Sequence, residues 1–149
     1  MAVERTFTML KPGVLARRIS GEIISRMERK GFDIIAAKLV RIPRTLAETH
    51  YAEHRAKPFF GELVDYITSG PVFAMILEGD DAIALLRKLC GSTRAEDAAP
   101  GTIRGDYAMH TGLNIIHASD SPASAEREIA LFFKPEEIMD WQDGNDNWI

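Results

Sequence analysis

The spacing of apolar side chains changes several times along the first part of the chain, and each change predicts an element. Residues 6–10 alternate polar with apolar side chains and stop at Lys11-Pro12, which is typical of a strand that leads into a turn. Apolar side chains then recur on one face of a helix that Ser20 can cap and that Gly31 ends. The chain is therefore expected to open with a strand and a helix.

The middle of the chain continues this alternation of strands and helices. Residues 32–42 again have strand character, and the capping-box spacing of Thr45-Leu46-Ala47-Glu48 predicts the start of a helix. The run 71–77 is apolar nearly throughout, which is typical of a central strand buried on both faces. Asp80 is expected to cap the helix that follows, which continues to Leu89.

Residues 92–111 show little periodicity and predict a long loop, which is uncommon in a compact domain unless it has a function. A last strand ends near His117, and Ser121-Pro122 supplies a cap and a first-turn proline for the final helix. The order of elements predicts an α+β fold: a ferredoxin-like βαββαβ sandwich with an antiparallel sheet, inserted helices and a long loop before the last strand. Because no repeat or linker-like run interrupts the pattern, one domain is expected over residues 1–149.

Composition narrows the function classes. The 149 residues have a net charge of −4, which argues against general nucleic-acid binding, because that would need a basic patch to neutralise phosphates. No apolar run approaches the length of a membrane span and the first residues lack a secretory pattern, so a cytoplasmic location is expected. The single Cys90 forms no CxxC motif and is expected to be a small buried side chain.

His117 is the first candidate for chemistry, since an imidazole at a strand end beside small polar residues can act as a nucleophile or bind a metal. Arg87 and Arg104 flank a glycine-containing loop, and two arginines of an acidic chain could converge on one phosphate. Structural alternatives stay open at this point. They are a hydrogen-bonded histidine at a strand edge, an arginine that complements a helix dipole, and core packing for helix-spaced aromatic side chains.

Six short motifs carry the most specific information in the chain. They are Glu4-Arg5-Thr6-Phe7, Pro58-Phe59-Phe60, Ser69-Gly70-Pro71-Val72, Arg87-x-x-x-Gly91-x-Thr93, Pro100-Gly101-Thr102-Ile103-Arg104-Gly105-Asp106 and Asn114-Ile115-Ile116-His117-x-Ser119-Asp120-Ser121. In this order and spacing they resemble the motifs of nucleoside diphosphate kinases, and the resemblance extends without a gap from about Glu4 to Trp148. It implies ping-pong transfer of the γ-phosphoryl group of a nucleoside triphosphate, typically ATP, to a nucleoside diphosphate through a phosphohistidine.

By this resemblance His117 takes the phosphoryl group, Glu128 fixes its ring and Ser119 bridges to Glu128. A carboxylate suits this chemistry, because an imidazole attacks best when it is neutral and its second nitrogen is held. Lys11 and Tyr51 complete the residues assigned to catalysis. The resemblance assigns substrate binding to Lys11, His54, Phe59, Leu63, Arg87, Thr93, Arg104 and Asn114.

The resemblance also implies Mg²⁺, held by the nucleotide phosphates rather than directly by protein side chains. It implies a broad range of ribo- and deoxynucleotides, because stacking on Phe59 accepts every base. Members of the family form homo-oligomers, and the tail from Trp141 to Trp148 favours a hexamer over a tetramer. Neither a membrane nor a nucleic acid is expected as a partner.

The chain departs from the family pattern at several positions. Gly13-Val14 replace the usual Asp-Gly pair, and Ala118 replaces a glycine, which would cost stability if that position needs a positive φ. Thr111 stands where an aliphatic residue usually meets the base, and it should make that wall more polar. Two alternatives stay open: a nucleotide-binding regulatory pseudoenzyme of the same fold, and a ferredoxin-like nucleic-acid binder, which the acidic charge opposes.

Overall fold

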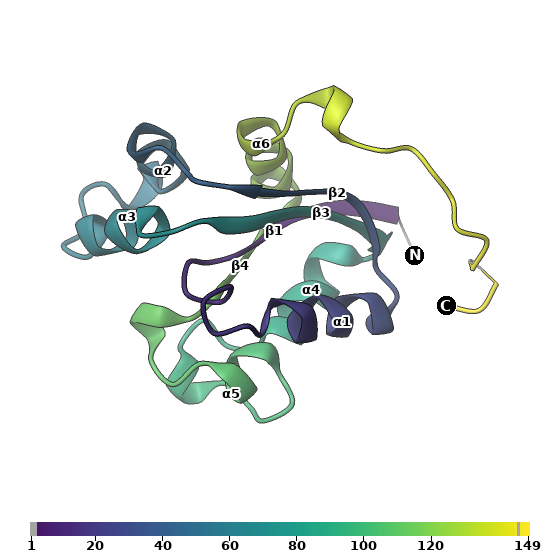
Figure 1. Ribbon diagram of the computed structural model, residues 1–149, viewed down its shortest axis with the longest axis horizontal. Helices are drawn as coiled ribbons and strands as arrows, with labels where there is room; N and C mark the ends of the chain where they lie inside the picture. The colour runs from purple at the N-terminus through teal and green to yellow at the C-terminus, as the bar shows by residue number, and fades with distance from the viewer. Residues whose placement is uncertain (1–2, 146) are drawn as a thin grey trace.

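Four strands form one antiparallel sheet with helices on both of its faces (Figure 1). The computed structural model describes residues 3–145 and 147–149. The elements, in chain order, are β1 (Val3–Leu10), α1 (Ser20–Lys30), β2 (Asp33–Val40), α2 (Arg44–His50), α3 (Phe60–Thr68), β3 (Val72–Asp80), α4 (Ala82–Cys90), α5 (Ile103–Tyr107), β4 (Ile116–Ala118) and α6 (Pro122–Phe132). This is the expected βαββαβ order, with α2 and α3 inserted between β2 and β3.

The strand order across the sheet is β2-β3-β1-β4, and each neighbouring pair is antiparallel. β3 pairs with β2 on one side and with β1 on the other, which confirms that its apolar run forms a central strand. Because side chains of a strand alternate between faces, Met75 and Leu77 pack in one hydrophobic cluster, and Ala74 and Ile76 pack in the other. The ferredoxin-like fold predicted from the sequence is confirmed.

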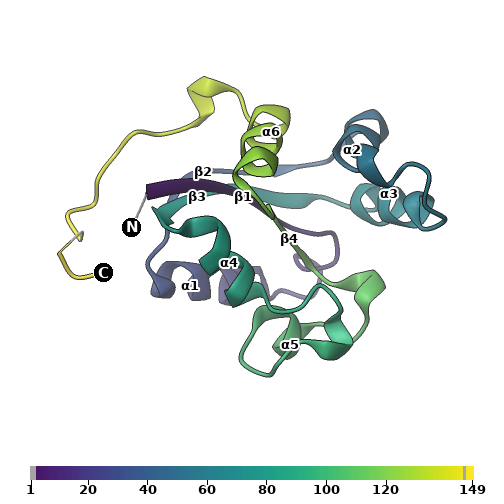
Figure 2. The same ribbon diagram turned by 180° about the vertical axis from the view of Figure 1, so that it is seen from behind.

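The helices divide between the two faces of the sheet, as Figures 1 and 2 show from opposite sides. α1 and α4 cover one face, where Met27 and Leu86 are buried, and α6 covers the other, where Phe132 packs on Phe7. α2 and α3 extend beyond one end of the sheet. Among the helices of residues 3–145 and 147–149, none has the length and apolar character that a membrane crossing requires.

Three predicted helix starts are wrong in detail. Ser20 is the first residue of α1 and its side chain makes no cap bond. α2 begins directly after Pro43, so Thr45-Leu46-Ala47-Glu48 lies inside the helix and forms no capping box. Asp80 is still paired in β3, and Asp81 takes the position before α4. At Asp80 the reason is sheet pairing, because β3 continues through Asp80 and the helix begins only after it.

The start of α6 is as predicted. Ser121 accepts a hydrogen bond from the backbone N–H of Ser124 at 3.1 Å, and Pro122 occupies the first turn, where its missing N–H is not needed. This local signal fixes the beginning of the helix that carries Glu128.

The segment 92–111 is more ordered than the long loop that the sequence predicts. It contains α5 and a 3₁₀ turn at Ala95–Asp97. Thr102 caps α5 by accepting a hydrogen bond from the Gly105 N–H at 3.0 Å. Arg104 therefore lies on a short helix and not in a loop, which gives its side chain a defined direction.

Candidate active site

One cavity of about 480 Å³ collects the residues that the sequence motifs point to. It lies between the arm formed by α2 and α3 and the segment around α5, at the end of the sheet where β1 pairs with β4. The predicted residues in its wall are Lys11, Tyr51, His54, Phe59, Leu63, Arg87, Thr93, Arg104, Asn114, His117 and Glu128. Ser119 lies behind Glu128 and is fully buried. Tertiary folding thus brings residues from distant parts of the chain into one wall.

His117 occupies the middle of β4, opposite Met9 of β1. Its backbone carbonyl accepts a hydrogen bond from the Thr8 hydroxyl at 2.7 Å, which fixes the strand at this point. Alternation along β4 buries Ile116 in the core on one side and leaves His117 partly exposed on the other. Ala118 is not among the described residues with a positive φ, so alanine in place of the family's glycine introduces no backbone strain there.

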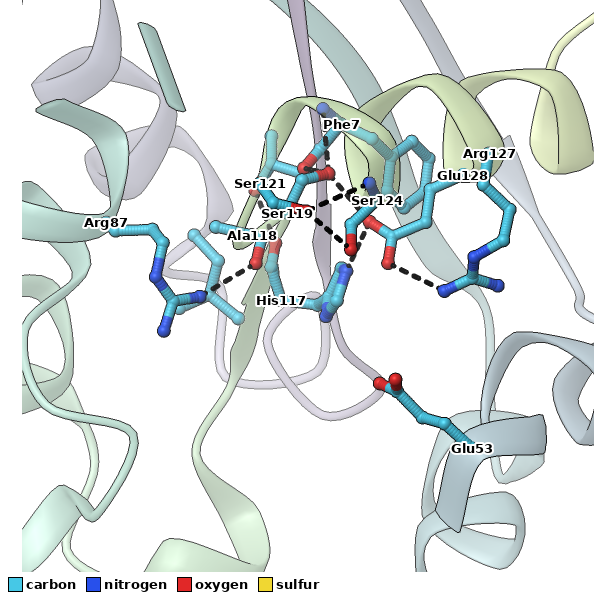
Figure 3. Close-up of polar contacts among 12 residues, drawn as sticks. Phe7, Glu53, Arg87, His117, Ala118, Ser119, Ser121, Ser124, Arg127 and Glu128 are labelled. Atoms are coloured by element: carbon cyan, nitrogen blue, oxygen red, sulfur yellow. Dashed lines mark hydrogen bonds and ion pairs between the residues drawn. The ribbon is translucent and has the colours of Figure 1, made fainter. Parts of the chain in front are cut away.

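A hydrogen-bonded chain of three side chains holds the His117 ring (Figure 3). Nε2 of His117 lies 2.8 Å from Oε1 of Glu128, and the Ser119 hydroxyl donates to the same oxygen at 2.6 Å. Burial raises the pKa of Glu128, but the hydrogen bonds and the charge of its partners outweigh burial and hold that pKa below its ordinary value. Glu128 is therefore ionised at neutral pH and accepts a hydrogen bond from the Nε2–H group. This leaves Nδ1 as the basic nitrogen of the ring.

Replacing Ser119 with alanine is expected to lower both stability and the rate of chemistry at His117. The change removes a hydrogen bond to a buried carboxylate, worth about 1–3 kcal/mol. Urea unfolding and single-turnover kinetics measure the two effects. The matched control is Ser121→Ala, which loses the cap of α6 and should cost about 1 kcal/mol without slowing chemistry. Equal rates for the two variants would contradict the bridging role of Ser119.

Arg104, which the sequence assigns to phosphate binding, lines the cavity and also makes structural hydrogen bonds. The guanidinium is 5% exposed and donates to three backbone carbonyls: Asn114 at 3.3 Å, Gly91 at 3.0 Å and Ile116 at 2.7 Å. A guanidinium has five N–H donors, so two remain for a ligand in the cavity that Arg104 lines. Arg104 therefore ties α4, α5 and β4 together, in addition to lining the cavity.

Arg87 also contacts β4, because its Nη1 donates to the carbonyl of Ala118 at 3.1 Å (Figure 3). Asn114 accepts a hydrogen bond from Nζ of Lys11 at 2.8 Å and donates to the Thr93 carbonyl at 3.3 Å. Each of these cationic or polar side chains is thus held by a neighbour before any ligand is bound. Such preorganisation reduces the cost of binding an anion.

Lys11 is 6% exposed at the cavity wall. Its backbone N–H donates to the Ile115 carbonyl at 2.8 Å, so the turn after β1 presents it although Gly13-Val14 replaces the family's pair. Gly13 has a φ of +96° and Val14 is buried in the core, which makes this pair well suited to the turn. Burial, and then the charge of Arg104, lower the pKa of Lys11 to about 7.

The depressed pKa of Lys11 predicts that the nucleotide-free protein gains stability as pH rises above about 7. Between that value and the ordinary pKa of 10.5 the unfolded chain binds the proton and the folded protein does not, so the free energy of unfolding rises with pH. The slope from this group is at most about 1.4 kcal/mol per pH unit. Urea unfolding of the wild type and of Lys11→Met from pH 6 to pH 10 measures the contribution of Lys11, which is the difference between the two unfolding free energies at each pH. Parallel curves would contradict this prediction.

Aromatic side chains form the outer end of the cavity. Phe59 is 42% exposed and its ring centroid lies 5.7 Å from that of His54, on the arm that α2 and α3 form. Leu63 lies one helical turn beyond Phe59 and lines the same wall. Tyr51 is buried, burial raises the pKa of its phenol, and its hydroxyl has no hydrogen-bond partner among the described residues. An exposed ring above a polar pocket suits stacking of a planar base.

Thr111 lies in the opposite wall, where the sequence predicts a more polar surface. Its hydroxyl contacts the carboxylate of Glu96 and accepts a hydrogen bond from the Ala95 N–H at 3.1 Å, and its own N–H donates to Glu96 at 3.1 Å. Through those bonds Thr111 joins the two halves of the segment 92–114. The polarity of Thr111 thus serves the loop as well as the wall.

Sequence reasoning missed His50, which lies in the same wall and is buried against His117. The only signal was its helical spacing after Ala47, a buried position of α2. One donor atom each from His50, His117 and Glu128 lies within 4.8 Å of the others. Two imidazoles and a carboxylate suit zinc-like ions better than Mg²⁺, which prefers oxygen ligands.

A second cavity, of about 560 Å³, lies on another side of α6. Apolar side chains such as Ile83, Ile129 and Phe133 dominate its wall, and none of the predicted site residues belongs to it. Despite its size it lacks the converging polar groups that chemistry needs. The smaller cavity around His117 is the candidate active site.

Comparisons with known proteins show the family of the chain. The family model described as "Nucleoside diphosphate kinase" matches residues 4–138. Proteins named nucleoside diphosphate kinase from Archaeoglobus fulgidus and Treponema pallidum are 57% and 58% identical, over 99% and 97% of this chain and 97% of each relative. A solved nucleoside diphosphate kinase from Halobacterium salinarum, in complex with CDP, superposes with a TM-score of 0.96 at 52% identity, covering 99% of this chain and 98% of that one.

Proposed function

Because the chain belongs to the nucleoside diphosphate kinase family, and is therefore a phosphotransferase, we propose that His117 carries the phosphoryl group between a nucleoside triphosphate and a nucleoside diphosphate. The observation that supports this most is the 2.8 Å contact between His117 and Glu128 at the wall of a cavity that also holds three basic side chains. The alternative of a regulatory pseudoenzyme gains no support, since the matched relatives are named kinases.

In the first half-reaction Nδ1 of His117 attacks the γ-phosphorus of the triphosphate. An N–P bond forms as the bond from that phosphorus to the bridging oxygen breaks, and the nucleoside diphosphate leaves with the bond's electron pair. The Nε2 proton stays on the ring, where Glu128 stabilises the positive charge that the ring acquires. In the second half-reaction a β-phosphate oxygen of a different diphosphate attacks the phosphorus and forms an O–P bond, and the N–P bond breaks with its electron pair returning to Nδ1, which leaves the ring neutral.

Phosphate binding in this proposal falls to Lys11, Arg87 and the two remaining N–H donors of Arg104. Positioning and charge neutralisation account for most of the catalysis of phosphoryl transfer, because its transition state is loose. Asn114 already contacts Lys11, and in this proposal both bind the sugar hydroxyls and Lys11 also binds the transferring phosphate. The base stacks on Phe59 without edge contacts, which gives a broad base range.

We further propose that Mg²⁺ arrives with the nucleotide. The carboxylates in the wall are those of Glu53, Glu62, Asp120 and Glu128. Glu128 is already hydrogen-bonded to His117 and Ser119. This arrangement fits an ion that keeps water and phosphate oxygens as its main ligands. When bound, Mg²⁺ would neutralise negative charge on the nucleotide phosphates.

Other expectations of the sequence remain proposals of the same kind. Residues 1–149 act as one domain, the protein works in the cytoplasm, and copies of the chain assemble into a hexamer in preference to a tetramer. The CDP bound by the Halobacterium salinarum relative supports a nucleotide ligand here. Hydrodynamic mass during dilution tests the assembly, and a monomer would contradict it.

Intact-mass spectrometry tests the proposed chemistry directly. The protein is mixed briefly with ATP and Mg²⁺ at neutral pH and then chased with GDP. The expected result is one acid-labile phosphoryl adduct that GDP removes as GTP. A folded, nucleotide-binding protein that never gains the adduct would overturn the proposal.

A further inference from the structure

The ring of His117 is held on a second side by another histidine. His50 is the last residue of α2 and is 4% exposed. Its ring centroid lies 4.7 Å from that of His117, with the ring planes 82° apart. Aromatic rings at this separation and angle make a favourable edge-to-face contact.

His50 is itself fixed by other rings. Phe132 of α6 lies 5.3 Å away at 78°, and Tyr51 lies 4.7 Å away at 63°. Phe132 stacks on Phe7 at 4.8 Å, and Phe7 lies 5.9 Å from His117. The His117 ring is thus packed against side chains of β1 and α2, while α6 supplies its hydrogen bond from Glu128.

A single hydrogen bond does not fix an imidazole, because the ring can still tilt about the line from Nε2 to the carboxylate oxygen. The contact with His50 restricts that tilt. We propose that His50 is a positioning residue that holds the His117 ring with Nε2 on Glu128 and Nδ1 free for the nucleotide. This inference rests on the proposed role of His117 as the nucleophile.

The position also requires an uncharged ring. Burial lowers the pKa of His50 to about 2, assisted by the positive charges of His117, Arg127, Lys11 and His54. These groups belong to β4, α6, the turn after β1 and the 3₁₀ turn after α2, and the acidic side chains in the same wall are Glu53, Glu62, Asp120 and Glu128. His50 is therefore neutral at working pH and does not repel the charge that His117 gains during transfer.

If His50 acts by packing, the shape of its ring matters and its nitrogen atoms do not. Nδ1 of His50 is buried without a hydrogen-bond partner among the described residues, which costs about 1–3 kcal/mol. Phenylalanine keeps a flat ring in this place and removes that cost. Leucine fills a similar volume without a flat ring edge, so the pair His50→Phe and His50→Leu tests the contact itself.

The first measurement is the ¹⁵N NMR spectrum of the imidazole nitrogens in the nucleotide-free protein, with His117→Ala used for assignment. The wild type and His50→Phe should show His117 as one tautomer, protonated at Nε2. His50→Leu should show exchange between the two tautomers. A merely structural role for His50 would not move this signal.

The second measurement is the rate of phosphoenzyme formation by rapid quench, together with the dissociation constant for a nucleoside diphosphate. His50→Leu should form the phosphoenzyme about 10–100-fold more slowly at nearly unchanged nucleotide affinity, because small misplacement of a nucleophile has effects of this size. His50→Phe should restore the rate and raise the unfolding temperature.

Two results would overturn the proposal: a His50→Leu protein with a single His117 tautomer and the wild-type rate, or a folded His50→Phe protein as slow as His50→Leu. Absence of a phosphoenzyme in the wild type would instead overturn the proposed role of His117. The tautomer measurement needs no turnover, so the two failures are distinguishable.

Discussion

A protein with His117 replaced by alanine is expected to bind nucleotides and to form no phosphoenzyme. The ring lies in the cavity wall with its side chain 21% exposed, so its loss leaves the core and the basic side chains in place. Because the ring nitrogen forms the covalent intermediate in the proposed reaction, transfer should fall by at least about ten-thousandfold, the scale of losing a nucleophile. Coupled nucleotide assays and intact-mass spectrometry measure the effect.

The matched control is His110→Ala, which removes an exposed imidazole that does not line the cavity. It should keep full activity and the same phosphoryl adduct. A His117→Ala protein that still gains an acid-labile adduct would place the nucleophile elsewhere, and His50 and His54 would then be the nearest imidazoles in the wall.

The second large effect is expected at Arg104. Alanine at this position removes the side-chain donors of the Gly91 and Ile116 carbonyls, while the Asn114 carbonyl keeps the Ile116 N–H as a donor at 2.8 Å. Each buried, unpaired polar group costs about 1–3 kcal/mol, so the free energy of unfolding should fall by roughly 3 kcal/mol. Phosphate binding should weaken as well, because the wall loses a cation and β4 loses its support.

Chemical unfolding and nucleotide titration check this prediction at a temperature where the variant is folded. Arg94→Ala is the control, because its side chain is 71% exposed and its ion pair with Asp97 should contribute less than about 1 kcal/mol. The free energy of unfolding of Arg104→Lys should lie between those of Arg94→Ala and Arg104→Ala. An ammonium keeps the charge, but it cannot reach three carbonyls as a planar fork does. Equal stability of the Arg94 and Arg104 variants would show that the three bonds contribute little.

Local patterns of the sequence predicted the elements that depend mainly on their own residues. The run 71–77 is apolar because β3 has a neighbour on each side and a helix layer on each face. Ser121-Pro122 marks the start of α6, because a serine cap and a first-turn proline act within one turn. The helix starts at Ser20, Thr45 and Asp80 were wrong, and at Asp80 the reason is that strand pairing overrides a local cap.

The resemblance to a family named the residues that line the cavity, yet it did not describe what each one touches. Arg104 was expected to face phosphate, and only the fold shows that three of its donors hold backbone carbonyls. Ala118 was a possible source of strain, and only its backbone angles remove that concern. No motif pointed to His50, because a contact between α2 and β4 has no signature in either segment.

The sequence by itself determined the order of strands and helices and the acidic balance, because periodicity and residue chemistry are local properties, and its resemblance to a family named the candidate site residues. Tertiary structure alone decided which ring nitrogen of His117 is held, how far Lys11 is buried and which side chains pack against the His117 ring. These depend on distances between residues far apart in the sequence, such as Lys11 and Asn114, which are 103 positions apart. Only packing of the sheet against its helices sets such distances.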